Sequence, residues 1–495
     1  MSATRGNGSG YKIVFRLEMT DMNLRSHRRN MQKGIRERWF GNQAFYRSVL
    51  TLLIPIIVQQ FISSFVSLLD NVMVGSLGTE AISATSIANT VLNVLMLAIF
   101  GGLSGAGIFS AQFYGRGDME GMRHTFRFKM YFGLIITILA IAVYLLFGEN
   151  FIASFLRGES NGGNLELTLH EGVDYLRVML WGQIPFALVQ IYAGTLREAG
   201  ETRAPMVAGI CAICTNLFLN WVLIFGNLGA PAMGVRGAAL ATVISRYVEL
   251  AIVVTHAHRN TDKYEFFRHA YRSGYVPPRL IGRIARMGFP LLINEILWSL
   301  GMTLINQFYS TRGLNAVAAL NISGTAWNLF CVIMFAMGSA VSIMVGQRLG
   351  AGELEEARDV DRKLIVLTEI IHILIGAAMI IAAPAVPKLY NVTPEVRDLT
   401  RRMLVIAGLS LPLHSFAHVT YFTIRSGGRT MITFLFDAVY TWAVTVTLAF
   451  CLTRLTDLPI VEIYFCVQFI DVIKLVIGLL MLRSDFWAQN VVKDM

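Results

Sequence analysis

The composition of this 495-residue chain excludes a soluble globular protein. Hydrophobic residues make up 55% of the chain and charged residues only 15%, and the mean hydropathy is +0.56. A chain this long and this apolar is typical of a polytopic membrane protein. Its formal net charge of +10 is explained by basic loops described below, so we expect no nucleic-acid partner.

Twelve apolar runs are long enough to cross a bilayer. A membrane-spanning helix needs about 20 apolar residues. The sequence predicts such helices near residues 48–70, 84–108, 130–148, 174–195, 205–226, 235–255, 287–309, 316–344, 363–386, 403–423, 430–452 and 459–482. Pro55, Pro185, Pro290 and Pro412 lie inside these runs and predict bends. The predicted fold class is an all-α polytopic membrane protein with twelve transmembrane helices.

The distribution of Lys and Arg predicts the orientation, because short loops rich in these residues stay on the cytoplasmic side. They follow the even-numbered spans up to the tenth: Arg116, Arg123, Arg127 and Lys129; Arg197 and Arg203; the run from Arg259 to Arg286; Arg348, Arg358, Arg362 and Lys363; and Arg425 and Arg429. Both termini are then cytoplasmic, in a multi-pass protein of the cell (inner or plasma) membrane.

The first residues are basic and lack the apolar core of a signal peptide. We interpret residues 1–44 as a cytoplasmic arm; the alternative is that translation begins at Met19, Met22 or Met31. The other predicted segments are a six-helix lobe over 45–256, a cytoplasmic inter-lobe loop over 257–285, a second six-helix lobe over 286–482 and a cytoplasmic tail over 483–495.

The two halves of the chain repeat each other. A shift of 235 residues places Pro55 on Pro290, Asn71 on Asn306, Gly78 on Gly313, Asn93 on Asn328, Phe100 on Phe335, Gln112 on Gln347, Gly115 on Gly350, Gly117 on Gly352 and Arg123 on Arg358. A shift of 228 matches "LREAGETR" at 196–203 with "IRSGGRT" at 424–430. The period is six helices, so both lobes have the same orientation and form parallel repeats, between which many secondary transporters bind their substrate.

Several motifs together resemble the multidrug and toxic compound extrusion (MATE) family. They are "LLDNVMVGSLG" at 68–78, "GRGDMEGMR", "GAGELEEAR", "LREAGETRAPM", "NLFLNWVLIFG" and "GVRGAALATVISR". The resemblance implies a secondary exporter, not an enzyme, in which Na⁺ or H⁺ moving inward drives organic, often cationic, molecules outward without any other cofactor. Its partners are then small organic molecules and the lipid bilayer, and we expect a monomer.

Asp70 is the first candidate site residue. A carboxylate within a membrane span costs about 2.5 to 3.5 kcal/mol, so it usually faces a cavity and has a partner or a task. Asn216 and Asn220, four residues apart, share one helical face. The resemblance implies that Asp70 and these asparagines form a cation site of the first lobe, for Na⁺ or a proton. The alternative is a solvated helix end.

Glu295 is the second candidate. It lies about nine residues, roughly 13 Å, beyond Arg286, and none of its neighbours at i±3 or i±4 is basic. The repeat places Gln60 at the equivalent position. An acid at this depth is expected to exchange a proton, Na⁺ or a cationic drug, and the resemblance implies a cation site of the second lobe. The alternative is a structural, hydrogen-bonded acid.

Asp437 and His414 are two further candidates. Asp437 has no obvious local partner in its span, whereas Asp471 and Lys474 are three residues apart and are predicted to neutralise each other. The span of His414 contains no acid, although some sodium-coupled MATE members carry one at a comparable place. The coupling ion therefore stays open between Na⁺ and H⁺.

Two other functions fit the sequence less well. A flippase for a lipid-linked saccharide, from the same superfamily, would need more arginines within the cleft to bind pyrophosphate. A membrane-embedded enzyme would need a catalytic motif, and the sequence contains no H-E-x-x-H and no G-x-x-x-x-G-K-[ST] phosphate loop. The predicted function is therefore secondary active multidrug efflux.

Overall fold

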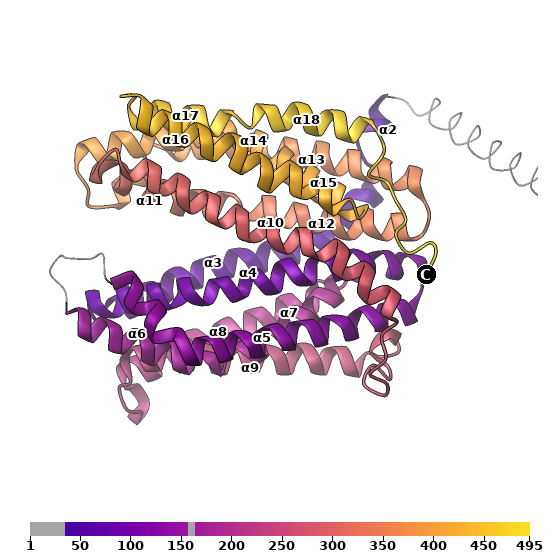
Figure 1. Ribbon diagram of the computed structural model, residues 1–495, viewed down its shortest axis with the longest axis horizontal. Helices are drawn as coiled ribbons and strands as arrows, with labels where there is room; N and C mark the ends of the chain where they lie inside the picture. The colour runs from indigo at the N-terminus through magenta and orange to yellow at the C-terminus, as the bar shows by residue number, and fades with distance from the viewer. Residues whose placement is uncertain (1–34, 157–163) are drawn as a thin grey trace, which may run out of the picture.

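The computed structural model describes residues 35–156 and 164–495. Most of the predicted arm at 1–44, including the alternative start positions, lies outside these residues. All regular secondary structure in the described part is helical, which confirms the predicted fold class. The helices form two bundles, which Figure 1 shows as a lower and an upper layer.

The first bundle contains the helices from residue 43 to residue 259. They are α3 (Gln43–Gly75), α4 (Thr79–Arg116), α5 (Met119–Leu156), α6 (Leu165–Leu180), α7 (Gln183–Glu198), α8 (Arg203–Phe225), the short 3₁₀ turn η1 (Asn227–Gly229) and α9 (Gly234–Arg259). Within this bundle α8 packs along α9, and α4 packs on α5 and α6.

The second bundle begins after a connecting segment that contains the 3₁₀ turn η2 (Glu265–Phe267). It consists of α10 (Pro278–Ser310), α11 (Leu314–Phe330), α12 (Val332–Gly350), α13 (Leu354–Ala382), η3 (Val386–Leu389), α14 (Pro394–Ser426), α15 (Thr430–Phe434), the π-helical turns η4 (Leu435–Val439) and η5 (Thr441–Val446), α16 (Thr447–Leu455), α17 (Ile460–Phe469) and α18 (Val472–Arg483). The short helix α2 (Ile35–Trp39) also contacts this bundle, at α13.

Eleven helical segments of the described part are long and apolar enough to span a membrane. The predicted fourth span is not among them, because it is divided into α6 and α7, of 16 residues each. The break at Trp181 and Gly182 precedes Pro185, whose ring would collide with the Trp181 carbonyl in a continuous helix. We assign the twelfth crossing to this pair of helices. The predicted eighth span is also divided, at Cys331, and only its second helix, α12, is among the eleven. The helices that contain Pro55, Pro290 and Pro412 continue through them.

The repeat extends to the backbone conformation. Glycines at equivalent positions have positive φ angles, which are strained for residues that carry a Cβ atom. The φ angles are 133° and 103° at Gly78 and Gly313, 77° and 80° at Gly117 and Gly352, and 81° and 77° at Gly200 and Gly428. These pairs mark the same helix boundaries in both bundles, so the sequence repeat corresponds to a structural repeat.

The two bundles meet closely where α4 crosses α12, at the end of the molecule that holds the C-terminus (Figure 1). A Cβ atom on Gly115 would lie 1.8 Å from the Gln347 carbonyl oxygen, and a Cβ atom on Gly350 would lie 1.9 Å from the Gln112 carbonyl oxygen. The repeat relates these two contacts. Any larger residue at either glycine would force the two helices apart.

Two glutamine side chains join the bundles at the same crossing. The amide of Gln112, on α4, donates to the Ser426 carbonyl at 2.9 Å. The amide of Gln347, on α12, donates to the Glu198 carbonyl at 2.8 Å. The repeat relates these hydrogen bonds as well, because Gln112 matches Gln347 and Glu198 matches Ser426. We refer to this α4–α12 crossing with its glutamines as the seam.

The C-terminal residues pack against the seam and add hydrogen bonds to Gln112. The amide of Gln112 also donates to the Gln489 carbonyl at 3.1 Å, and its oxygen accepts from the Val491 backbone N–H at 2.7 Å. Asn490 donates to the Gly350 carbonyl at 3.0 Å, and the Trp487 side chain is only 2% exposed. The predicted tail over 483–495 is therefore an ordered segment that contacts both bundles.

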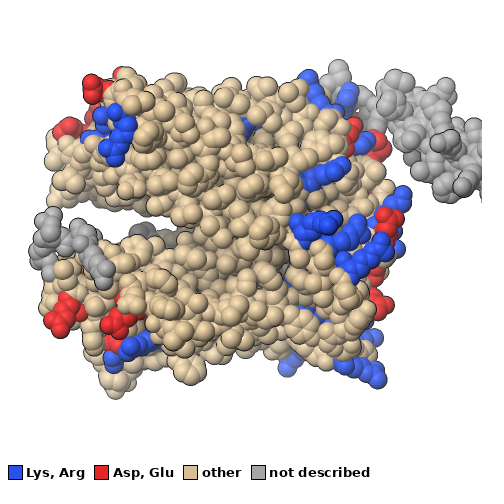
Figure 2. Space-filling view, viewed as in Figure 1, with Lys and Arg blue, Asp and Glu red and all other residues tan. Residues whose placement is uncertain are grey.

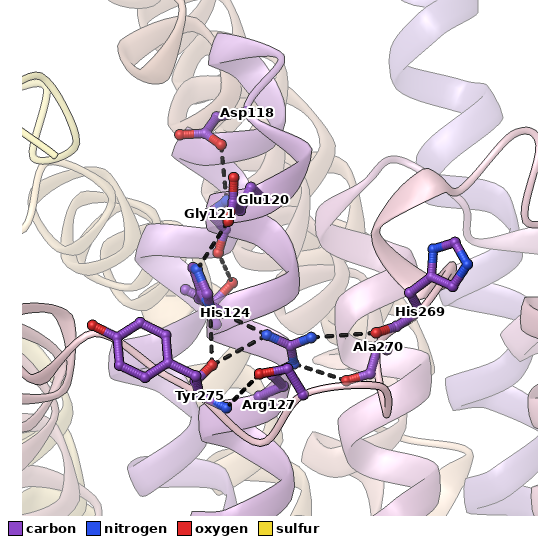
Figure 3. A network of polar contacts seen from close by, with 10 residues as sticks. Asp118, Glu120, Gly121, His124, Arg127, His269, Ala270 and Tyr275 are labelled. Atoms are coloured by element: carbon purple, nitrogen blue, oxygen red, sulfur yellow. Dashed lines mark hydrogen bonds and ion pairs between the residues drawn. The ribbon is translucent and has the colours of Figure 1, made fainter.

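The connection between α9 and α10 is docked against the first bundle. The side chains of Phe266 and Phe267 are at most 1% exposed. Arg127 of α5 donates to the carbonyls of His269, Ala270 and Tyr275 at 3.2, 2.7 and 3.1 Å (Figure 3). Because these three carbonyls share one guanidinium, this part of the predicted inter-lobe loop has a fixed path.

A carboxylate outside the membrane holds the start of the same connection. Glu201 accepts from the Lys263 ammonium at 2.8 Å and from the Tyr264 hydroxyl at 2.6 Å. Burial by itself raises the pKa of Glu201, but the hydrogen bonds from Lys263 and Tyr264 outweigh it and hold the pKa at about 2. Glu201 is thus ionised, and this contact is intact, at neutral pH.

We predict that Gln112→Ala destabilises the protein more than Gln347→Ala. The first change leaves the Ser426 and Gln489 carbonyls and the Val491 N–H without their partner, whereas the second frees one carbonyl. A buried polar group that loses its hydrogen bond costs about 1 to 3 kcal/mol. Thermal unfolding midpoints of the purified variants in detergent measure the difference, and equal midpoints would contradict the role given to the C-terminal segment.

Candidate functional site

A cleft separates the two bundles at one end of the molecule. Figure 2 shows it as a hollow that opens at the left-hand end and narrows toward the middle, whereas most Lys and Arg gather at the opposite end. Near the middle α4 meets α10, where a Cβ atom on Gly105 would lie 2.5 Å from the Gly288 Cα atom. The two glycines thus allow the bundles to touch at the inner end of the cleft.

The structure brings the three predicted residues of the first bundle together. Asp70 lies near the end of α3, and the Asn220 amide of α8 donates to its Oδ1 at 2.6 Å. The Asn216 amide is satisfied when its nitrogen faces Asp70, at 3.0 and 3.2 Å from the two carboxylate oxygens, and its oxygen accepts from the Thr242 hydroxyl at 3.2 Å. Two neutral amides therefore hold the carboxylate.

The Asp70 site offers oxygen atoms and an uncompensated negative charge. No ion pair joins Asp70 to a base within the described part of the chain, and the buried Asn220 Oδ1 lacks a hydrogen-bond partner there. A carboxylate with amide oxygens suits a hard cation such as Na⁺, and the carboxylate alone can carry a proton. In residues 35–156 and 164–495 no group of three or more His, Cys, Asp or Glu could hold a metal ion, so a cation here would depend on the amides.

Sequence reasoning missed a residue that positions this site and one that lies close to it. Thr242 of α9 fixes the Asn216 amide, whereas Tyr175 of α6 lies near Asp70 but directs its hydroxyl to Asn89, at 3.3 Å. Each is far from Asp70 in sequence. No local pattern distinguishes them, because α6, α8 and α9 bring them near only when the bundle is packed.

A continuous chain of hydrogen bonds surrounds Glu295 in the second bundle. The Tyr421 hydroxyl of α14 donates to Glu295 Oε1 at 3.3 Å. The Asn294 amide donates to the Tyr421 hydroxyl at 3.4 Å and to Asp437 Oδ2 at 3.1 Å. Lys474 of α18 completes the chain, 3.1 Å from Asp437 Oδ1. Glu295 and Asp437, predicted separately, therefore belong to one network.

The ion pair between Lys474 and Asp437 corrects one prediction. Asp437 has no partner in its own span, as predicted, but it has one on α18. Lys474 does not pair with Asp471 in the described structure, although Asp471 is the N-cap residue of the same helix, because the Lys474 ammonium contacts Asp437 instead. Asp471 instead lies 3.7 Å from His414 Nδ1.

The π-helical turns provide a hydrogen-bond partner for the buried Asn294 side chain. In a π-helix the backbone hydrogen-bond pattern shifts by one residue, which frees groups that an α-helix would pair, and such turns often occur at functional sites. The Ala438 N–H, within η4, donates to Asn294 Oδ1 at 3.1 Å. Asn294 is 1% exposed. One buried amide thus satisfies the irregular backbone and the Asp437 carboxylate together.

His414 makes a separate set of contacts. Its Nε2 hydrogen-bonds with Gln468 Oε1 at 2.6 Å, and its ring packs edge-on against Trp327 with centroids 5.4 Å apart. It does not hydrogen-bond directly with Glu295 or Asp437 in the described structure. The contacts of His414 are those of a side chain that ties α14 to α17.

Arg425 corrects a prediction about the loops. We assigned it to a cytoplasmic connection, but it lies in the last turn of α14 and is 7% exposed. Its guanidinium lies over the Phe422 ring at 5.0 Å and over the Phe100 ring of α4 at 5.9 Å. Its Nε and Nη1 atoms have no hydrogen-bond partner among the described residues. Arg425 therefore brings a buried positive charge to the contact between the bundles.

Comparison with known families decides the assignment. The model of the MatE family matches residues 55–222 and again residues 290–451. The protein belongs to the MatE family. The two matched segments begin 235 residues apart, which is the shift found in the sequence, so each bundle is one copy of the MatE unit.

Curated proteins similar to this MatE chain are named as multidrug resistance proteins. The probable multidrug resistance protein NorM of Thermotoga maritima is 23% identical over 448 residues, which cover 90% of this chain and 94% of the relative. The probable multidrug resistance protein YoeA of Bacillus subtilis is 27% identical over 422 residues, which cover 85% and 89%. The similarity therefore extends over nearly the whole length of both proteins.

Solved structures of transporters share the fold. A mutant of a Vibrio cholerae MATE transporter superposes with a TM-score of 0.81 at 18% identity, over 90% of this chain and 98% of that chain. A MATE family transporter in an outward-facing conformation superposes with a TM-score of 0.78 at 20% identity, over 88% and 95%. The two-bundle architecture is therefore that of the MATE transporters.

Proposed function

We propose that this protein is a secondary active multidrug efflux transporter. An inward flow of H⁺ or Na⁺ drives organic, often cationic, compounds out of the cell by antiport. The observation that carries the proposal is the Asp70 site, a carboxylate held by two amides without a base among the described residues, in a MatE protein with a cleft between its bundles. The names of the curated relatives support the same class of substrate.

Alternating access supplies the transport step in this proposal. The cleft opens at the end opposite to the one rich in Lys and Arg (Figure 2), so the positive-inside rule makes this conformation outward-facing. The seam between α4 and α12 then closes the cytoplasmic end. Transport requires the seam to separate and the outer cleft to close, with substrate bound between the bundles.

In this proposal Asp70 couples the inward movement of the ion to the outward movement of the drug. A cation that reaches Asp70 from outside neutralises the carboxylate, and a cationic drug is then released because it loses its counter-charge. The neutral site returns to the inward-facing conformation, where the ion dissociates. The same cycle operates with a proton or with Na⁺. Glu295 takes part in binding the cationic drug from the second bundle.

The orientation is tested by cysteine labelling in a variant without the five native cysteines. We predict that Gly229→Cys reacts with a membrane-impermeant maleimide in intact cells and that Arg272→Cys does not. Both positions are exposed, so only the side of the membrane distinguishes them. Lysed cells, in which both react, are the control. Labelling of Arg272→Cys in intact cells would reject cytoplasmic placement of the α9–α10 connection.

Asp70→Asn tests the coupling site. The amide keeps the volume of the side chain and removes its titratable charge, so we predict that efflux falls to background while insertion and the thermal midpoint stay near wild type. Fluorescent-cation transport in everted vesicles is measured with a Na⁺ gradient and with a proton gradient in turn. Glu166→Gln, at an exposed acid of α6, is the control with normal efflux. Wild-type rates for Asp70→Asn in both gradients would show that the carboxylate is only structural.

Glu295 is tested by a pair of substitutions. We predict that Glu295→Gln abolishes ion-driven efflux, because the amide cannot offer a negative charge, whereas Glu295→Asp keeps part of it with the carboxylate withdrawn by one methylene. The same vesicle assay measures both variants. If Glu295→Gln pumps normally in both gradients, Glu295 serves only to accept the Tyr421 hydrogen bond.

A further inference from the structure

The second bundle contains a buried lysine that the proposed cycle does not use. Lys474 is 6% exposed, and its ammonium contacts Asp437 from the first turn of α18. We propose that the Lys474 ammonium occupies the place beside Asp437 in which the second bundle could otherwise bind a cation. The Asp437 network then binds no Na⁺, and the coupling ion acts only at Asp70. This inference rests on the proposed transporter function.

The contrast between the two bundles supports the inference. Both hold a carboxylate bound by an asparagine amide: Asp70 by Asn220 at 2.6 Å, and Asp437 by Asn294 at 3.1 Å. Only Asp437 also has an ammonium within ion-pair distance in the described structure. A carboxylate that already has a buried counter-charge binds a second cation only weakly, because displacing the first cation costs free energy.

Aromatic side chains hold the ammonium in its position. The Tyr440 ring lies 4.9 Å from Lys474 Nζ and the Phe436 ring 5.9 Å from it, close enough for cation–π attraction. The Tyr440 hydroxyl donates to the Ile470 carbonyl at 2.8 Å, at the break between α17 and α18. The rings beside Lys474 therefore favour a cation at this point.

A second buried cation lies near the network. The Arg425 guanidinium is within electrostatic range of Glu295, and Lys474 pairs directly with Asp437. A Na⁺ ion bound at Asp437 would have to enter beside the Lys474 ammonium in a region of low dielectric constant, where like charges repel strongly.

Removing the ammonium should create a cation site. In Lys474→Met the Asp437 carboxylate keeps the hydrogen bond from the Asn294 amide, so its oxygen atoms and one uncompensated negative charge remain. These are ligands that a hard monovalent cation prefers. Lys474→Arg keeps the positive charge and should leave the network closed to Na⁺.

Equilibrium binding of radioactive Na⁺ tests the inference on the purified full-length protein in lipid nanodiscs. Choline keeps the ionic strength constant, and the pH is alkaline so that protons do not compete. We expect Lys474→Met to bind one more Na⁺ per protein than wild type, and Lys474→Arg and Lys388→Met to equal wild type. Lys388 is an exposed lysine and serves as the matched control. The extra Na⁺ should persist with Asp70→Asn added and be lost with Asp437→Asn added.

Two outcomes would overturn the inference. One is a folded Lys474→Met protein that binds no additional Na⁺. The other is measured with Lys474 in place. We expect Asp70→Asn to bind no Na⁺. If that variant does bind Na⁺, and the binding disappears when Asp437→Asn is added, the network accepts Na⁺ beside the lysine. The second measurement decides the question if Lys474→Met fails to fold. Because the assay measures ion binding and not efflux, failure of the drug-transport proposal would be seen separately in the vesicle experiments.

Discussion

Charge inside the membrane-spanning bundles is the constraint on which the functional architecture depends. A charged side chain removed from water is stable only when hydrogen bonds or an opposite charge replace its hydration. The two bundles meet this requirement in different ways. Around Asp70 the replacement comes from neutral amides, so a negative charge is left to attract a cation. Around Asp437 it comes from Lys474, so no charge is left.

The repeat provides a symmetric frame in which this difference arises. Equivalent glycines lie at equivalent helix boundaries, and Gln112 and Gln347 make equivalent hydrogen bonds across the seam. The polar side chains do not all follow the repeat. Glu295 matches the neutral Gln60 in the other bundle. The C-terminal segment binds Gln112 but not Gln347 among the described contacts. The backbone frame is thus shared, while the polar groups within it differ between the bundles.

Irregular backbone occurs where the polar side chains of the second bundle gather. The π-helical turns present the Ala438 N–H to Asn294, and Lys474, which contacts Asp437, lies in the first turn after the break between α17 and α18. In a membrane such irregularities are tolerated only where other groups satisfy the freed backbone. Here the buried amide of Asn294 and the Tyr440 hydroxyl do so. The departures from regular helix are therefore part of how the network is built.

The sequence by itself determined the elements whose signals are local or periodic. Apolar runs of sufficient length predicted the spans, the shift of 235 residues predicted the two bundles, and the spacing of Asn216 and Asn220 predicted that both face the same way, as they do at Asp70. Only the tertiary structure decided the pairing of charges. Lys474 lies three residues from Asp471 yet binds Asp437, and Arg425 is buried against Phe100 of the other bundle. Both partners are distant in the chain and are brought together by helix packing, which local sequence spacing does not reveal.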